Sequence, residues 1–317
     1  MTERYESSVI ISTYNQPDWL EKCLWGFAYQ TDRRFEIVIA DDGSEPETRQ
    51  KAEAVCQALG LPLNYVWHPD DGFQKCRILN KAILAARSDY LLFTDGDCIP
   101  KPDFIATHLT LRRPGHFLSG GYFKLPMSTS RLISQDDVAT GRAFTAAWLR
   151  AHDVTAPWNK LLKVTATPRQ AWWANRITPA NRSWNGNNSS TWRDLAVQVG
   201  GFDERMGYGG QDREFGERLM NAGIRPIMMR YSTGMLHLDH SRGYRNEEGI
   251  RKNRAIRAET RRLKLTRTVH GLPLESAAAD SQEIHSRRAR CPPGDGITAA
   301  ACAASGRPAG SHRTGLR

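Results

Sequence analysis

The chain has 317 residues, of which 40% are hydrophobic and nine are Trp, enough for one large α/β domain or two small ones. Its formal net charge of +10 favours polyanionic partners such as nucleic acid, anionic lipid headgroups or phosphorylated substrates. No apolar stretch approaches the roughly 20 residues that span a bilayer, and the first residues lack the pattern of a signal peptide, so we expect a globular cytoplasmic protein.

The first part of the chain alternates short apolar strands with helical stretches. Strands are predicted at 8–14, 35–40, 63–67 and 89–94, with helices beginning at residue 18 and covering 46–59 and 75–86. This alternation predicts a doubly wound, mostly parallel sheet with helices on both faces. Ligands bind beyond the carboxyl ends of the strands in such sheets, which is where Asp41, Asp42, Asp95 and Asp97 fall.

The pattern becomes irregular from about residue 118. A helix is predicted at 212–222, a strand at 225–231 and a basic helix at about 247–268. Six of the nine Trp lie between residues 148 and 192, which fits a second hydrophobic layer and an aromatic platform for an acceptor sugar equally well. The segment 271–317 has no apolar period and is predicted to be a disordered tail.

The six cysteines are scattered along the chain and include no C-x-x-C pair. They are Cys23, Cys56, Cys76, Cys98, Cys291 and Cys302. Neither a zinc knuckle nor a disulfide framework is indicated, so we expect free thiols.

Two acidic segments follow predicted strands. Asp95-Gly96-Asp97 places two carboxylates on one turn, and such oxygen ligands suit Mg²⁺ or Mn²⁺. A D-x-D motif is common by chance, but its position after a buried strand supports a metal-binding role. Asp41-Asp42-Gly43-Ser44 fits either a turn with a helix cap or a second polar group at the same sheet edge.

Two later segments carry further candidates. Asp212 follows Gly209-Gly210 at a predicted helix start, where a helix cap and a catalytic base are compatible roles, and Glu214 is the alternative base on the same turn. His237 and His240 place two imidazoles three residues apart after a predicted strand. This spacing allows one or both to bind a metal, although structural histidines would give the same pattern.

Taken together, these segments resemble family 2 glycosyltransferases of the GT-A fold. More closely, they resemble the bacterial branch whose C-terminal part is similar to β1,4-galactosyltransferases and chondroitin polymerases. The resemblance covers residues 8 to about 265 and rests on segments at 9–15, 41–44, 70–73, 94–97, 200–204, 209–212 and 237–242. It implies one GT-A domain over 1–270, with a nucleotide-binding half at about 1–117 and an acceptor and catalytic half at about 118–270.

The resemblance also assigns the donor site. It implies that Ser12, Tyr14 and Asp42 hold the uridine of a UDP-sugar, with Arg77 near the base or the diphosphate. Asp95 would face the ribose and Asp97 the metal. The galactosyltransferase segment Met-x-x-His-Ser-Arg matches His237 through Arg242, which makes His240 the preferred further ligand of Mn²⁺ or Mg²⁺, with His237 in place of the Met.

The catalytic base implied by the resemblance is Asp212. The family has Glu-Asp where this chain has Gln211-Asp212, and the missing Glu usually helps to hold the acceptor sugar, so acceptor identity stays open. We therefore predict an inverting hexosyltransferase that transfers a sugar from a UDP-sugar to a hydroxyl of a glycan or lipid-linked saccharide. The predicted setting is bacterial surface polysaccharide synthesis.

Two other function classes fit part of the sequence. A sugar-phosphate nucleotidyltransferase needs a Gly-rich basic loop after the first strand, where this chain has residues 12–17 without a glycine. A nucleic-acid-binding protein would use the basic residues, which are concentrated at 251–268. A basic helix of this kind more often binds an anionic membrane surface. We therefore expect peripheral contact with the inner membrane face through this helix and no nucleic-acid partner.

Overall fold

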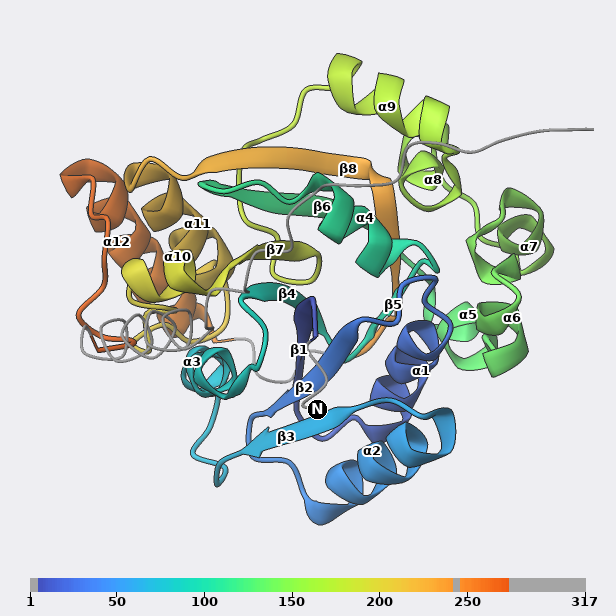
Figure 1. Ribbon diagram of the computed structural model, residues 1–317, viewed down its shortest axis with the longest axis horizontal. Coiled ribbons are helices and arrows are strands. Elements are labelled where there is room, and N and C mark those ends of the chain that lie inside the picture. The colour runs from blue at the N-terminus through green and yellow to red at the C-terminus, as the bar shows by residue number, and fades with distance from the viewer. Residues whose placement is uncertain (1–4, 242–245, 274–317) are drawn as a thin grey trace, which may run out of the picture. The chain divides into compact units, whose positions relative to one another are not determined.

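A computed structural model describes residues 5–241 and 246–273 of the protein. Over these residues eight strands form one sheet in the order β3-β2-β1-β4-β7-β6-β8-β5, with helices on both of its faces (Figure 1). The predicted doubly wound, mostly parallel α/β architecture is confirmed, and the order reverses direction at β1, as it does in doubly wound sheets.

The first half of the sheet is entirely parallel. Its strands are β1 (Ser7–Thr13), β2 (Phe35–Asp41), β3 (Leu63–Trp67) and β4 (Tyr90–Asp95), connected by α1 (Pro17–Ala28), α2 (Pro46–Leu59) and α3 (Lys75–Ala85). Val9, Ile10 and Ile11 on β1 have no exposed surface, because helices cover both sides of the strand. This double burial explains why the central strands have near-continuous apolar sequences.

Two hydrophobic layers enclose this half of the sheet. On one face Leu24 and Phe27 of α1 pack with Cys56 of α2 against the strands. On the other face Ile83 of α3 packs in a cluster that also contains Phe215 from a later helix. The two layers hold the strand ends in fixed positions, and the site described below is built from those ends.

The second half of the sheet is mixed. Its strands are β5 (Cys98–Pro100), β6 (His116–Lys124), β7 (Ser189–Trp192) and β8 (Arg225–His237). β7 is antiparallel to β4 and β6, β8 runs parallel to β6, and β5 pairs antiparallel with the end of β8. β8 is longer than the predicted strand at 225–231, and a bulge opposite Gly120/Gly121 lets it continue to His237.

The remaining helices are short except for the last two. They are α4 (Phe104–Leu111), α5 (Met127–Leu132), α6 (Gln135–Ala139), α7 (Ala146–Ala151), α8 (Trp158–Thr165), α9 (Pro168–Ile177), α10 (Arg193–Gln198), α11 (Gln211–Asn221) and α12 (Glu247–Leu263), with a 3₁₀ turn at Arg142–Phe144. α12 ends five residues before the predicted boundary, where Lys264 takes a left-handed conformation with φ 52°. None of the helices in the described part of the chain is long and apolar enough to cross a membrane.

A buried polar network joins the two halves of the sheet. Ser190 on β7 lies 2.7 Å from both the hydroxyl of Tyr90 and Nδ1 of His108, and Nε2 of His108 is 3.1 Å from Asn188 Oδ1. The amide oxygen can only accept, so His108 Nε2 carries the proton and Nδ1 accepts from Ser190. Burial lowers the pKa of His108 to about 3, which keeps this imidazole neutral.

The tryptophans between residues 148 and 192 do not share one role. Some are buried in the hydrophobic core and others are exposed on the surface. Trp148 and Trp184 are buried, and Trp192 lies edge-on to Tyr90 with 5.0 Å between the ring centroids. Trp158, Trp172 and Trp173 on α8 and α9 are exposed. None of these three lines either of the two cavities described below, whereas the buried Trp184 lines the second.

Four cysteines, Cys23, Cys56, Cys76 and Cys98, are buried free thiols, as predicted, whereas Cys291 and Cys302 lie outside the described residues. Leu272, which the sequence places in the tail, packs in the main core, and its N–H donates to Gly200 O at 2.8 Å. The folded part of the chain therefore continues past residue 270. The predicted disorder at 274–317 concerns residues outside those described.

Candidate active site

A cavity of about 930 Å³ lies at the carboxyl ends of β1 and β4. Eight of the nine predicted site residues line it: Ser12, Tyr14, Asp42, Asp95, Asp97, Asp212, His237 and His240. They come from loops and strand ends widely separated in the sequence, at the edge where doubly wound sheets bind ligands. The ninth, Arg77, lies elsewhere.

The D-x-D turn is held against the end of β1. Ser12 pairs with Asp95 in the parallel register, and its hydroxyl donates to Asp95 Oδ1 over 2.8 Å. Lys75 Nζ lies 2.5 Å from the same carboxylate oxygen, and the N–H of Gly96 donates to Ser12 O over 2.8 Å. The turn that presents Asp97 is therefore fixed by bonds to its neighbouring strand and to α3.

Asp42 and Tyr14 line the other end of the cavity. Asp42 is buried, and its oxygens lie 2.8 Å from His68 Nε2 and 3.0 Å from the N–H of Gln74. Burial raises the pKa of Asp42 above its usual value, while the bonds to His68 and Gln74 oppose that rise. Tyr14 is partly exposed and donates to Asp70 Oδ2 over 2.8 Å. Each Asp42 oxygen keeps a free lone pair for a further donor.

Asp97, His237 and His240 form a cluster at the junction of β5 and β8. His240 Nε2 is 2.9 Å from Asp97 Oδ2, His237 Nε2 is 3.8 Å from it, and the two rings stack with an interplanar angle of 7°. The Nδ1 atoms lie 2.8 Å from Leu238 O for His237 and 2.7 Å from Ser241 O for His240. Because a carbonyl oxygen can only accept, both Nδ1 atoms are protonated.

This arrangement fits a divalent cation. With Nδ1 protonated, each neutral ring turns the lone pair of Nε2 toward a carboxylate, so the acceptors face one another unless a proton or a cation lies between them. When protons take that place, burial still raises the pKa of Asp97, but the bond donated by His240 and the positive charges of both protonated histidines outweigh it and lower the pKa to about 2. One carboxylate and two imidazoles within 4.8 Å of one another are a plausible donor set for Mn²⁺.

Asp212 is the second residue of α11, not its cap. The N-cap is Gly210, whose φ of 91° is in the left-handed region that favours glycine. Asp212 Oδ1 accepts from the N–H of Arg213 at 2.8 Å, and Oδ2 lies 3.4 Å from the N–H of Gly186. The predicted cap is thus wrong, while the half-exposed carboxylate still opens into the cavity.

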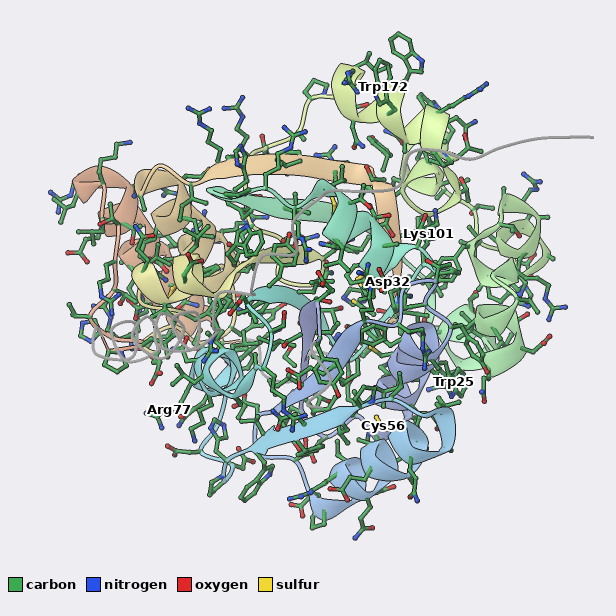
Figure 2. The ribbon with its side chains drawn as sticks, viewed as in Figure 1. Trp25, Asp32, Cys56, Arg77, Lys101 and Trp172 are labelled. Atoms are coloured by element: carbon green, nitrogen blue, oxygen red, sulfur yellow. The ribbon has the colours of Figure 1, made fainter. Side chains whose placement is uncertain are left out.

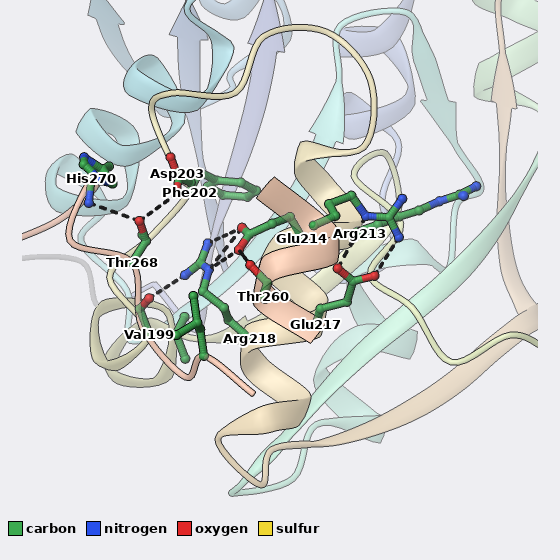
Figure 3. A network of polar contacts seen from close by, with 12 residues as sticks. Val199, Phe202, Asp203, Arg213, Glu214, Glu217, Arg218, Thr260, Thr268 and His270 are labelled. Atoms are coloured by element: carbon green, nitrogen blue, oxygen red, sulfur yellow. Dashed lines mark hydrogen bonds and ion pairs between the residues drawn. The ribbon is translucent and has the colours of Figure 1, made fainter. Parts of the chain in front are cut away.

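Glu214, the alternative base, is buried and its carboxylate is already bonded to other core residues. Its carboxylate forms a two-point ion pair with Arg218 at 2.8 Å and accepts from Thr260 Oγ1 at 2.9 Å (Figure 3). Both Glu214 and Arg218 are 1% exposed, and Arg218 also donates to Val199 O. A carboxylate held in this way has no access to a substrate, so Asp212 is the available base on this turn.

Arg77 does not line the cavity. It lies on α3 and pairs with Glu204, with 3.3 Å between Nε and Oε2, and Figure 2 shows it pointing away from the sheet. Residues 75 and 77 are in the first turn of α3, where successive side chains point in different directions. The prediction that Arg77 approaches the base or diphosphate is therefore not supported by its position.

Lys75 is the cation that sequence reasoning missed. It lines the cavity, and its pKa is raised because the charge and hydrogen bond of Asp95, with the charges of Asp97 and Asp212, outweigh the effect of burial, which lowers it. The charges of three predicted site carboxylates thus act on one ammonium group, and Asp95 contacts it directly. The available clue was a lysine in the first turn of the helix after Asp70-Asp71-Gly72-Phe73.

The basic helix also contributes to the cavity. Arg254 and Arg257 of α12 line it, and Arg257 Nη2 bonds Glu217 Oε1 of α11 at 2.6 Å. Arg251 and Lys252 of α12 are exposed and do not line this cavity. Arg242, the last residue of the predicted metal segment, lies outside the described residues.

The model of the glycosyl transferase family 2 matches residues 8–112 of the chain. Validoxylamine A glucosyltransferase of Streptomyces hygroscopicus subsp. jinggangensis is 28% identical over 244 residues, which are 72% of this chain and 54% of that protein. The chain carries a family 2 glycosyltransferase domain at residues 8–112. It spans about half the length of the validoxylamine A glucosyltransferases that it matches.

Solved structures agree with this chain in fold. The mannosyltransferase PcManGT from Pyrobaculum calidifontis, in complex with GDP-Man and Mn²⁺, is 18% identical with a TM-score of 0.52, covering 90% of this chain and 76% of that one. TarS 1–349 of S. aureus, in complex with UDP-GlcNAc, is 15% identical with a TM-score of 0.52, covering 89% and 72%. The GT-A fold predicted from the sequence is thereby confirmed.

Proposed function

We propose that this family 2 glycosyltransferase is an inverting, metal-dependent hexosyltransferase that transfers a sugar from a UDP-sugar to a saccharide hydroxyl. The observation that carries the proposal is that Asp212 and the cluster of Asp97, His237 and His240 line one cavity. A base and a cation site on the same cavity supply groups for both halves of a displacement at an anomeric carbon.

Asp212 is the group that takes the proton. As the acceptor oxygen forms its bond to the anomeric carbon, the bond from that carbon to the diphosphate oxygen breaks, and the nucleoside diphosphate leaves with the electron pair. The acceptor hydroxyl proton passes to the Asp212 carboxylate. A positioned base of this kind typically contributes about 10²- to 10⁴-fold to the rate.

Asp97, His237 and His240 are the proposed ligands of Mn²⁺ or Mg²⁺. A divalent cation bound there would act as a Lewis acid toward the departing diphosphate. The two Nδ1 bonds to backbone carbonyls hold the imidazoles with Nε2 toward Asp97, which prepares the site before a cation binds. PcManGT, which has the same fold, is in complex with Mn²⁺, and this supports a divalent cation without identifying its ligands.

The donor site is proposed for the cavity end formed by β1, β2 and β4. In this proposal Ser12, Tyr14 and Asp42 hold the uridine and Asp95 faces the ribose, and the support is that all four line the cavity. Lys75 replaces Arg77 as the nearby cation, because only Lys75 reaches the cavity. The UDP-GlcNAc complex of TarS supports a UDP-sugar donor.

The acceptor is proposed to be a glycan or lipid-linked saccharide in bacterial surface polysaccharide synthesis. Peripheral membrane contact is part of the same proposal. Its support is the exposed basic side of α12, which includes Arg251, Lys252 and Arg262. Each basic residue near anionic headgroups adds about 1 kcal/mol to membrane binding.

Incubation with a panel of UDP-sugars and Mn²⁺, with UDP release as the readout, tests the proposed activity. We expect slow release from one donor and faster release when an acceptor hydroxyl is supplied. The rival nucleotidyltransferase would instead make a UDP-sugar and pyrophosphate from UTP and a sugar phosphate. That outcome, with no UDP release from any donor, would replace the proposal.

A further inference from the structure

A second cavity, of about 750 Å³, adjoins the first. It is enclosed by residues of β6, β8, α8, α11 and α12 and by the segment 181–185, and α11 and α12 lie beside one end of β6 and β8 (Figure 1). Its volume is within the range of about 300–1,000 Å³ typical of ligand pockets. The two cavities share Tyr122, Asn185, Asp212, Arg213 and Arg257.

The position of this cavity identifies it with the acceptor side. It contains Asp212, the proposed base, but not Ser12, Asp42, Asp95 or Asp97 of the proposed donor site. A base must lie within hydrogen-bond reach of the acceptor hydroxyl. The second cavity reaches the proposed base without including those donor-site residues. An acceptor in it would therefore approach Asp212 without occupying the donor site.

The walls of the second cavity carry an excess of positive charge. Six cationic side chains line it, namely Lys163, Arg182, Arg213, Arg230, Arg257 and Arg261, against the two carboxylates of Asp212 and Glu217. Glu217 already pairs with Arg257 at 2.6 Å and with Arg261 at 3.3 Å. Charge of one sign in a low-dielectric cleft concentrates ligands of the opposite sign.

The other four cations have no acidic partner within the described part of the chain. Among the described residues, no carboxylate oxygen lies within 4.0 Å of the charged nitrogens of Lys163, Arg182, Arg213 or Arg230. Lys163 is half-buried, with Nζ 5.6 Å from the centre of the Tyr122 ring. Burial, followed by the charges of Arg230 and Lys160, lowers the pKa of Lys163, as expected where cations lack a counter-charge.

We propose that this second cavity is the acceptor site and that it selects saccharides bearing an oxyanion, a carboxylate or a phosphate, near the hydroxyl that receives the sugar. The inference rests on the proposed glycosyl transfer. Arg230 and Lys163 bind the oxyanion through charge-assisted hydrogen bonds, and Asp212 meets the neighbouring hydroxyl.

Direct binding tests the proposal without any need for turnover. The probes are a fluorescent uronate-containing oligosaccharide, its carboxyl-reduced neutral form, and a glycosyl phosphate, titrated by anisotropy against the full chain. We expect at least one anionic probe to bind about tenfold or more tightly than the neutral form, and its Kd to rise with salt. The anionic probe that binds better distinguishes a carboxylate from a phosphate acceptor.

A pair of charge-matched variants separates the cavity from general surface charge. Lys163→Gln with Arg230→Gln removes two cavity cations, and Lys160→Gln with Arg169→Gln removes two exposed cations from the neighbouring helices α8 and α9. We expect the cavity variant to raise the Kd for the anionic saccharide about tenfold, while the surface variant changes it less than twofold. Equal effects of the two variants would overturn the assignment.

Two further outcomes keep this inference distinct from the proposed function. If UDP is released from a donor and sugar is transferred to neutral and anionic acceptors equally well, the inference fails while the function stands. If no donor releases UDP, the function fails, and saccharide binding still decides the nature of the cavity. A generic DNA duplex that competes fully with the anionic saccharide would reassign the cavity to nucleic acid and overturn the inference.

Discussion

His240 Nε2 lies 2.9 Å from Asp97 Oδ2. Asp97 is in the turn between β4 and β5, whereas His240 follows the end of β8. The antiparallel pairing of β5 with β8 brings them together, because Cys98, next to Asp97, is the register partner of His237. The cation site therefore depends on a strand pairing across the sheet, and it forms with the fold instead of within one loop.

Loss of the cation should abolish turnover. We expect EDTA to stop UDP release and Mn²⁺ to restore it, because Asp97, His237 and His240 place their ligand atoms within 4.8 Å of one another. His240→Ala should raise the Mn²⁺ concentration for half-maximal activity by at least about tenfold. His116→Ala, which alters an imidazole outside both cavities, is the control. Full activity after exhaustive chelation would refute the cation site.

Lys75 and Arg77 should respond very differently to the same substitution. Lys75→Met leaves the Asp95 carboxylate without its cation at 2.5 Å, facing an anionic donor, so the donor KM should rise by about tenfold or more. Arg77→Met removes an exposed pair with Glu204 and should change the donor KM less than about twofold. Steady-state kinetics with varied UDP-sugar measure both. A larger effect at Arg77 would restore its predicted role.

The pattern of apolar strands was sufficient to predict the parallel half of the sheet. α2 and β3 have the predicted bounds, because each is a continuous period flanked by turn residues. β6 and β7 were not predicted, since their buried positions include Ser119, Gly120, Ser189 and Ser190, which hydropathy does not distinguish from a loop. The hydroxyl of Ser190 finds its partners, Tyr90 and His108, only in the tertiary structure.

The site residues that belong to turn motifs could be predicted from the sequence. The residues whose direction depends on how a helix is rotated against the sheet could not. Asp95, Asp97 and Asp212 follow recognisable turns, and the structure brings them to one cavity. The choice between Lys75 and Arg77 depends on which side of α3 faces the sheet, and that follows from packing. The second cavity draws on five separate elements, so no single segment of sequence indicates it.

Acid should destabilise the protein partly through His108. Its pKa is about 3 in the folded state, against about 6.5 when exposed in the unfolded chain, so the unfolded state binds more protons as pH falls. This contribution is complete above pH 6.5 and is lost progressively between about pH 6.5 and 3. His108→Gln should therefore show a shallower fall in the free energy of unfolding over that window in denaturant titrations. Equal pH slopes for the two proteins would show that His108 is not held neutral.

The central claim is that Asp212 is the base, and Asp194 provides a matched control for it. Both are the second residue of a helix and accept from the N–H of the next residue, at 2.8 Å for Asp212 and 2.7 Å for Asp194, but only Asp212 lines a cavity. The decisive measurement is the single-turnover rate of sugar transfer by Asp212→Asn and Asp194→Asn, with UDP-sugar and Mn²⁺ binding measured in parallel. The account predicts a fall of about 10²- to 10⁴-fold for Asp212→Asn alone, with binding retained, because Asn cannot take the proton. A transfer rate for Asp212→Asn within a few-fold of the parent would contradict it.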